Sequence, residues 1–322
     1  MKFSIAAAIT ALVVASAPAA AWNARGHMMV AAVAWSQMTP AARARATALL
    51  KLNPRYAEWT RGVANAERDE VAFVKAATWP DELRNMVCTQ GTPSPCYRDD
   101  GYTPPDAGAG INTGYADLRL RKYWHFEDLG FSPDGTPINE PFAFNAETQI
   151  AAFDTALGDA SLSDGAKSYD LAWLLHMVGD VHQPLHAVSR FTTTTPSGDS
   201  GGNAVKICLP GSGTCDEAHA KALHSFWDGA AGTNSSPQSA VDKAEHLQKT
   251  MFAAAVTDSA PGAWVAESFE LARNVAYAAP VGPGKGPYRL TTQYVAIAGT
   301  TAEQRVTLGG ARLARILNRR LN

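Results

Sequence analysis

Histidine and aspartate residues gather in two short runs of this 322-residue chain. Residues 176–186 read HMVGDVHQPLH and residues 224–228 read HSFWD, and together these runs contain half of the eight histidines. Imidazole nitrogens and carboxylate oxygens are ligands that zinc accepts. The two runs hold more of these groups than one zinc ion needs. They therefore predict a site for more than one metal ion.

The spacing inside each run places its ligands on one side of a helix. His176 and Asp180 are four residues apart, as are His224 and Asp228, and residues at this spacing share a helix face. Pro184 interrupts helical geometry, so we expect the chain to bend there and redirect the histidine at position 186. One His-x-x-x-Asp pair is usually a surface hydrogen-bonded pair. These pairs lie among apolar neighbours, where ionisable groups need a partner, and a cation is the simplest common one.

The rest of the chain reads as a helical scaffold for these ligands. Apolar residues recur at spacings of three and four over most of its length, which is typical of amphipathic helices. We expect helices over residues 22–52, 62–79, 140–159, 163–183, 216–229, 237–256, 261–279 and 301–321. The alternation typical of strands is confined to residues 122–126 and a short hairpin within residues 203–209. With no linker or repeat, the sequence predicts a mainly α fold, a single compact multi-helix domain.

The first 21 residues have the pattern of a secretory signal peptide. Lys2 gives a positive start, residues 5–14 are apolar, and residues 19–21 are alanines that suit signal cleavage. The alternative is an uncleaved membrane anchor, but the apolar stretch is short for spanning a bilayer. We expect removal of residues 1–21, leaving a mature domain at residues 22–322 that is periplasmic or secreted and has no membrane anchor.

The four cysteines suit an exported protein. Cys88 and Cys96 bracket one loop rich in Gly and Pro, and Cys208 and Cys215 bracket another. Four cysteines allow three pairings, of which the two local ones are favoured. Each disulfide would then staple one of two long loops, at residues 86–115 and 189–215.

The charge balance excludes one mode of nucleic-acid binding. The formal net charge is −2, whereas binding to duplex DNA through counterion release requires a basic face. A nucleic-acid substrate is still compatible with this chain if metal ions and base stacking hold it.

A family resemblance rests on several features in a fixed order. They are Trp22 followed five residues later by His27, the turn Trp79-Pro-Asp81, the triplet Trp124-His125-Phe126, the two runs above, and the closing segment 308–318. In these features the chain resembles the zinc-dependent single-strand nucleases of the S1/P1 type (type I nucleases), which are similar to zinc-dependent bacterial phospholipases C. The resemblance covers the whole mature chain. Pro80 departs from it, because Ala is commoner there and Pro restricts the backbone beside it.

The resemblance implies three Zn²⁺ ions and assigns their ligands. The first ion would be held by Asp81, His125, His176 and Asp180. The second would be held by His186, His224 and Asp228. The third would be held by the free α-amine and carbonyl oxygen of Trp22, by His27, and by Asp180 as a bridge. The chelate at Trp22 requires that no residue precede it. His182 matches no ligand position, and His219 and His246 are expected on the surface.

The resemblance also implies how substrate is handled. Asp81 would orient or deprotonate a water whose pKa the zinc ions lower, giving a metal-bound hydroxide, and Arg84 would stabilise charge on the phosphate. Phe126 would stack a base, Asp128 would hydrogen-bond the base edge, and Asn203 would lie near the phosphate. The alternative for Arg84 is a solvated arginine at a helix end. For Phe126, the residue pattern alone favours a core position.

The implied function is that of an exported, monomeric phosphodiesterase. It would hydrolyse single-stranded DNA and RNA to 5′-mononucleotides, with 3′-nucleotidase activity on nucleotides. Two alternatives stay open: a zinc-dependent phospholipase C, and an exported zinc-binding protein without hydrolase activity. A zinc metalloprotease is disfavoured because no His-Glu-x-x-His motif occurs.

Overall fold

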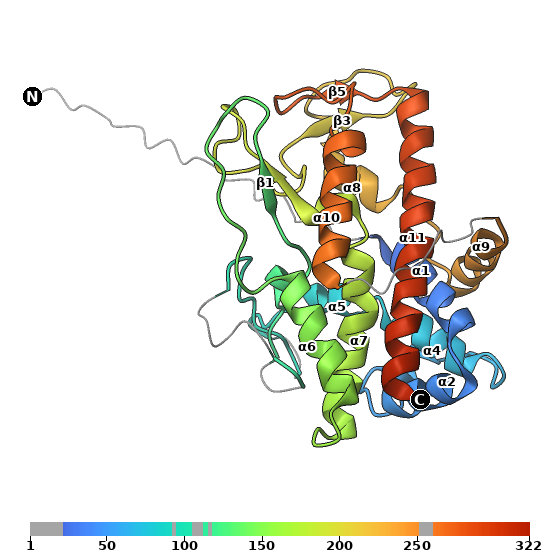
Figure 1. Cartoon of the computed structure of the whole chain (residues 1–322). Helices are drawn as coiled ribbons and strands as arrows, with labels where there is room; N and C mark the ends of the chain where they lie inside the picture. Colours follow the sequence, from blue (N-terminus) through green and yellow to red (C-terminus); the bar gives the residue numbers. More distant parts are fainter. Residues whose placement is uncertain (1–21, 92–94, 105–111, 115–117, 251–259) are drawn as a thin grey trace, which may run out of the picture.

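The computed structural model, shown in Figure 1, describes residues 22–91, 95–104, 112–114, 118–250 and 260–322. The expected signal peptide, residues 1–21, lies outside the described residues, as does part of the loop at residues 86–115. Among the described residues, no helix is both long enough and apolar enough to cross a membrane.

The described part of the chain is mainly helical, which confirms the predicted fold class. Its α-helices are α1 (Ala24–Gln37), α2 (Pro40–Leu50), α3 (Tyr56–Trp59), α4 (Arg68–Ala76), α5 (Trp79–Glu82), α6 (Ala146–Gly158), α7 (Asp164–Asp180), α8 (Leu223–Asp228), α9 (Pro237–Thr250), α10 (Pro261–Leu271) and α11 (Thr292–Leu321). Short turns of other helix types are η1 (Leu83–Met86), η2 (Lys122–Trp124), η3 (Pro184–Ala187) and the π-helical η4 (Ala272–Ala276).

Short strands occupy the end of the molecule drawn at the top of Figure 1. They are β1 (Leu129–Phe131), β2 (Val188–Arg190), β3 (Lys206–Cys208), β4 (Lys221–Ala222) and β5 (Tyr288–Arg289). β1 pairs in parallel with β2. β3 pairs antiparallel with β4 and parallel with β5. These small sheets tie the segments after α7 and α10 to the rest of the fold.

The helix α7 lies in the middle of the molecule and carries part of the candidate site. Ser163 caps its start, since its hydroxyl accepts the N–H of Ala166 at 3.2 Å. Every residue from Lys167 to Asp180 is buried. A helix that is buried all round cannot leave its polar side chains in water, so His176 and Asp180 must find partners inside the protein.

Several predicted boundaries were wrong, and proline explains the first. The helix expected over residues 22–52 is broken between α1 and α2. Pro40 has no N–H to continue the hydrogen-bond ladder, and Thr39 before it is extended. The Thr39 hydroxyl instead caps α2 by accepting the N–H of Ala42 at 3.1 Å.

The expected strands also differ from the structure. Residues 122–126 form no strand, because Arg121 lies in the left-handed region and η2 follows it. No hairpin forms within residues 203–209; β3 pairs with β4 and β5 instead, which lie far along the chain. The helix expected over residues 216–229 shrinks to α8 because β4 takes the residues before it.

Helix ends beyond α8 moved as well. The helix expected over residues 301–321 begins earlier, at Thr292, where the Thr291 hydroxyl accepts the N–H of Tyr294. The segment 261–279 is split between α10 and the π-helical η4.

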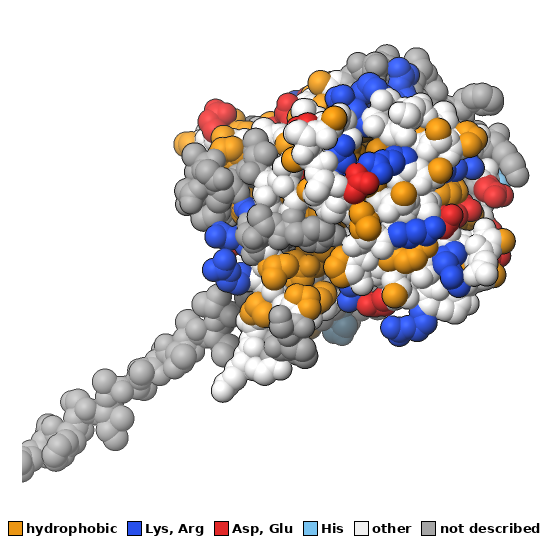
Figure 2. Space-filling model, turned by 90° about the horizontal axis from the view of Figure 1, so that it is seen from below, with side chains coloured by type: hydrophobic (Ala, Val, Ile, Leu, Met, Phe, Trp, Pro, Cys, Tyr) orange, Lys and Arg blue, Asp and Glu red, His pale blue; other side chains and the backbone are white. Residues whose placement is uncertain are grey.

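Both predicted disulfides are confirmed. Cys88 is bonded to Cys96 and Cys208 to Cys215, so each of the two long loops contains one covalent bridge. The charged side chains follow the balanced composition. On the face seen from below, Lys and Arg side chains are spread among apolar and polar ones rather than gathered in one area (Figure 2).

The long helix α11 packs directly on α1, side by side in Figure 1. The contact depends on Gly310. A Cβ at this position would lie 2.5 Å from Cβ of Val33 and 2.7 Å from the carbonyl oxygen of Val30. Neither backbone nor a β-branched side chain can move away easily, so the two helices approach this closely only because residue 310 has no side chain.

We predict that Gly310→Ala lowers the free energy of unfolding by about 1–3 kcal/mol through overpacking. Gly299→Ala in the same helix is the control. Its Cβ would meet nothing closer than the Ala230 carbonyl oxygen at 3.7 Å, so it should raise stability by up to about 1 kcal/mol. Urea unfolding of both variants measures this. Equal effects at the two positions would contradict the proposed role of Gly310.

Candidate metal centre and substrate cavity

Three groups of His and Asp side chains meet where α7 ends. In each group the potential ligand atoms all lie within 4.8 Å of one another. The groups are His27, Asp81 and His176; His125, His176 and Asp180; and His186, His224 and Asp228. They come from α1, α5, the residue after η2, α7, η3 and α8. The structure thus brings together every His and Asp ligand that the sequence predicted.

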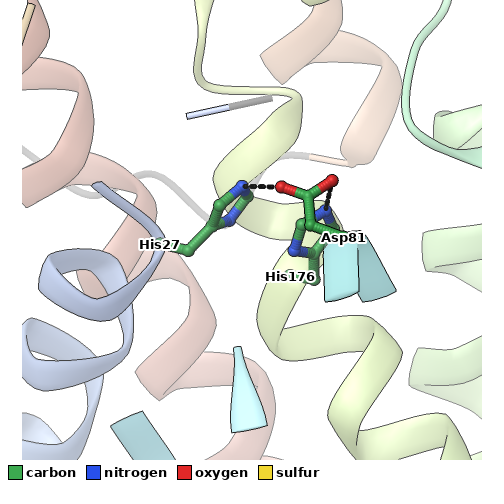
Figure 3. Close-up of side chains that lie close together, drawn as sticks. All are labelled: His27, Asp81 and His176. Carbon is green, nitrogen blue, oxygen red and sulfur yellow. Dashed lines mark ion pairs between the residues drawn. The ribbon is translucent and has the colours of Figure 1, made fainter. Parts of the chain in front are cut away.

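Asp81 faces two imidazoles in the first group from one side (Figure 3). Its Oδ2 is 3.9 Å from Nε2 of His27, and its Oδ1 is 3.8 Å from Nε2 of His176. The two imidazole rings stack, with centroids 3.8 Å apart and planes 15° apart. One carboxylate therefore faces two ring nitrogens, each with a different oxygen.

Asp180 joins the first group to the second. Its Oδ2 is 3.0 Å from Nδ1 of His125 and 3.2 Å from Nε2 of His176, while its Oδ1 is 3.4 Å from Nε2 of His27. The side chain is fully buried. With one oxygen turned to each side, Asp180 has the geometry of a bridging ligand.

The third group depends on the bend at Pro184. The chain leaves α7 at Asp180 and turns into η3, as the proline predicted. Nε2 of His186 then lies 3.0 Å from Nε2 of His224, which is 3.6 Å from Oδ1 of Asp228. Gln183 orients this group by donating from Nε2 to Asp228 Oδ1 at 2.8 Å.

Backbone carbonyls fix which nitrogen of each ring is free. Nδ1 of His176 is 2.8 Å from the Ala77 carbonyl oxygen, Nδ1 of His186 is 2.6 Å from that of His125, and Nδ1 of His224 is 2.7 Å from that of Gly201. A carbonyl only accepts, so Nδ1 carries the proton in each neutral ring. Nε2 of His186 and Nε2 of His224 are left facing each other, which is repulsive unless a cation lies between them, while Nε2 of His176 faces Nδ1 of His125.

Burial keeps two of the imidazoles in the neutral state that metal binding requires. It lowers the pKa of His27 to about 3, helped by the neighbouring His176, and lowers the pKa of His224 to about 3, helped by His186. These imidazoles are therefore neutral near pH 7. Burial also raises the pKa of Asp228 well above its usual range, so this carboxyl needs a nearby cation to ionise.

The ligand set fits zinc. Both ring nitrogens of His27 and Oδ1 of Asp180 are buried without a hydrogen-bond partner among the described residues. Buried polar atoms in that state normally have a partner, either water or an ion. Imidazole nitrogen with carboxylate oxygen, and no thiolate, suits Zn²⁺.

A cavity of about 420 Å³ opens over the metal centre. Its lining includes three of the candidate ligands, His125, His186 and His224. The remaining predicted site residues, Arg84, Phe126, Asp128 and Asn203, line the same cavity. Arg84 forms an ion pair with Asp81, from which it is separated by one turn. The site residues predicted from the sequence therefore line one cavity, although they lie far apart along the chain.

A comparison with known families places this site among known proteins. The model of the S1/P1 nuclease family matches residues 22–322. The chain belongs to this family. Nuclease P1 of Penicillium citrinum and nuclease PA3 of a Penicillium species are each 27% identical to it over 207 residues, which are 64% of this chain and 57% of those proteins. The aligned part thus spans little more than half the length of these relatives.

Two glycines that the sequence analysis left unassigned shape this S1/P1-type site. A Cβ on Gly179 of α7 would lie 2.8 Å from Nδ1 of His27, and one on Gly26 would lie 2.7 Å from Cβ of Trp22. Gly26 allows Trp22 to pack back onto α1, and Gly179 allows His27 of α1 to approach α7. In the sequence, the signal for this close approach of α1 to α7 is Gly179 itself, a glycine between the two candidate ligands of the segment HMVGD.

A buried acidic residue, Asp199, was also missed. It accepts the N–H groups of Arg190 at 2.9 Å and Gly202 at 3.2 Å, and the hydroxyl of Tyr277 at 2.9 Å. These bonds hold the turn that presents the Gly201 carbonyl to His224. No local motif marks Asp199, because its partners come from segments distant in sequence.

The remaining histidines fall outside the metal groups, as expected. His182 is buried, with Nδ1 2.7 Å from the Val178 carbonyl oxygen and Nε2 3.0 Å from a guanidinium nitrogen of Arg312 in α11. His219 is exposed and pairs with Asp216 at 2.6 Å.

We predict that His224→Ala lowers the zinc content by about one ion per chain, because it removes a ligand of a site with few others. His219→Ala is the matched control, since His219 also pairs with an aspartate but lies on the surface. Zinc per chain is measured by elemental analysis after dialysis. Equal loss in both variants, or loss in neither, would count against the assignment of His224 as a ligand.

Proposed function

We propose that this protein hydrolyses phosphodiester bonds of single-stranded DNA and RNA to 5′-mononucleotides, with 3′-nucleotidase activity, at a site for three Zn²⁺ ions. One observation carries the proposal. Imidazole nitrogens with free lone pairs meet at one cavity, whose lining also holds an aromatic ring and a carboxyl group, Phe126 and Asp128. Membership of the S1/P1 nuclease family supports the same reaction class.

The proposed zinc sites use the residues of the three groups described above and divide them as the family resemblance implies. Asp81, His125, His176 and Asp180 would hold one ion, and His186, His224 and Asp228 a second. The third would take His27, Asp180, and the α-amine and carbonyl oxygen of Trp22. When bound, zinc ions supply Lewis acidity, which polarises the phosphodiester and makes water more acidic.

The side chains of the cavity supply the other steps. Asp81 is ionised near neutral pH, because His176 and Arg84 lower its pKa although burial opposes them. It can accept a hydrogen bond from the attacking water and orient it toward phosphorus. Arg84 lines the cavity beside Asp81 and can donate to the phosphate oxygens as negative charge develops.

Base recognition would use Phe126 and Asp128. Phe126 is partly exposed and can stack a base, which requires that the base be unpaired. Asp128 can bind the base edge from the same cavity. Asn203 is half-buried, and its Nδ2 donates to the Ser200 carbonyl oxygen at 2.8 Å, leaving a second N–H for phosphate.

Signal cleavage after Ala21 is part of the proposal, since it would free the amine of Trp22. Two contacts of the start of the chain support it. Trp22 is fully buried against Gly26 and near Gly179. The N–H of Asn23 donates to the carbonyl oxygen of Asp228 at 3.0 Å. We further propose that the processed protein is exported, monomeric and free of a membrane anchor.

The deciding experiment measures cleavage of single-stranded DNA and RNA by protein whose Trp22 terminus is verified by mass spectrometry. We predict cleavage to 5′-mononucleotides that is lost on chelation and restored by zinc. A version with one extra residue before Trp22 should lose most activity, because the added peptide bond removes the free amine from the chelate.

Adding phosphatidylcholine to the substrates tested separates the alternative functions. Hydrolysis of phosphatidylcholine without cleavage of nucleic acid would establish a phospholipase C instead. Zinc binding with no hydrolysis of any of these substrates would establish a zinc-binding protein and refute the proposed reaction.

The pKa of Asp128 predicts a change of base preference with pH. Burial, with the negative charge of Asp199, raises this pKa to about 7. Below pH 7 the neutral acid can donate and accept, which suits adenine, whose edge has one acceptor and one donor. Above pH 7 the carboxylate only accepts, which suits the two donor groups of guanine.

We therefore predict that the ratio of kcat/KM for 3′-GMP over 3′-AMP rises about tenfold between pH 5.5 and 8.5. Taking the ratio cancels pH effects that both substrates share. Asp128→Asn, whose amide does not titrate, should give a ratio that is independent of pH. A ratio that rises equally in the variant would show that another group is responsible.

A further inference from the structure

We propose that Tyr102 forms a second base-binding subsite, which takes the nucleotide next to the one stacked on Phe126 in a single-stranded chain. The inference rests on the proposed function and extends it from one nucleotide to a longer substrate. Tyr102 belongs to the long loop at residues 86–115, whose role the sequence analysis left open.

The ring of Tyr102 has the position that such a subsite requires. It lines the same cavity as Phe126, and the two ring centroids are 6.5 Å apart with planes tilted by 33°. Tyr102 is 40% exposed, so part of its side chain is open to a ligand. Two neighbouring aromatic faces within the reach of one nucleotide suit consecutive bases, and stacking accepts any base.

Positive charges flank this ring. Nζ of Lys122 lies 4.8 Å from the centre of the Tyr102 ring, and both Lys122 and Arg84 line the cavity. Lys122 also pairs with Asp99 at 2.6 Å, so part of its charge is already balanced. The ring is therefore the main binding element, while Lys122 positions it and Arg84 supplies charge on the side of the metal centre.

The turn that carries Tyr102 is anchored although it lies on a loop. Asp99 accepts the N–H of Gly101 at 3.0 Å. Asp100 accepts the N–H of Arg121 at 2.9 Å and the hydroxyl of Tyr123 at 3.2 Å. These bonds fasten the turn to the segment that leads into His125. A ring held in this way loses little freedom when a base stacks on it.

The test compares two substrates with the same base. One is thymidine 3′-(4-nitrophenyl) phosphate, which has a single base, and the other is a single-stranded oligothymidylate. Tyr102→Ala should lower the ratio of kcat/KM for the oligonucleotide over the one-base substrate by about tenfold, mainly through KM. Tyr102→Phe keeps the ring and should retain the ratio. Tyr102→Leu keeps the bulk without an aromatic face and should behave like Tyr102→Ala.

Each result has one meaning. If the wild-type protein cleaves both substrates and Tyr102→Ala leaves the ratio unchanged, the subsite is refuted and the proposed function stands. If Tyr102→Ala lowers both activities equally, the ring supports the metal centre and binds no second base, which also refutes it. If the zinc-loaded wild-type protein cleaves neither substrate, the proposed function fails, and the subsite fails with it.

Discussion

The mutual repulsion of buried nitrogen and oxygen lone pairs is the constraint on which this structure depends. His27, His176, His186 and His224 are buried, and the three whose Nδ1 faces a backbone carbonyl turn Nε2 inward. Carboxylates at positions 81 and 180 add negative charge to the same region, and Asp228, whose pKa burial raises, would add more once a cation is near. Without a cation, burial of both ring nitrogens of His27 and of Oδ1 of Asp180 costs desolvation energy that no hydrogen bond from the described residues offsets. We therefore expect metal binding and the stability of the fold to be coupled.

Carbonyl groups rather than side chains orient most of the imidazoles. The acceptors belong to Ala77, His125 and Gly201, which lie in three different segments of the chain. The position of each ring thus depends on how helices and loops pack, not on its own helix alone. The same logic explains the buried Asp199, which holds the Gly202 turn and so fixes the carbonyl at residue 201. The orientation of the candidate ligands therefore depends on how distant segments of the fold pack together.

The features that could be predicted from the sequence are those that depend on residues close together in the chain. The spacing from His176 to Asp180 follows from one helix, and the bend at Pro184 follows from one residue, so both were predicted correctly. The pairing of β3 with β4 and β5 was not, because strand partners are chosen by packing across long stretches of chain. The roles of Gly26 and Gly179 also escaped the sequence analysis. A glycine in the sequence indicates that another group comes close to the backbone there, but it does not identify that group.

The weak net charge and the buried site agree with the proposed action on unpaired nucleic acid. A chain with a formal charge of −2 cannot gain much affinity by releasing counterions from a duplex. Under the proposed function, binding energy would come from inside the cavity, where the candidate metal centre, Arg84 and aromatic rings could contact one exposed nucleotide. A base in a duplex is already stacked and paired, and it must leave its partner before it can reach Phe126. If the protein acts on nucleic acid as we propose, a preference for single strands follows from where the charge and the rings lie, and no separate feature that rejects duplexes is required.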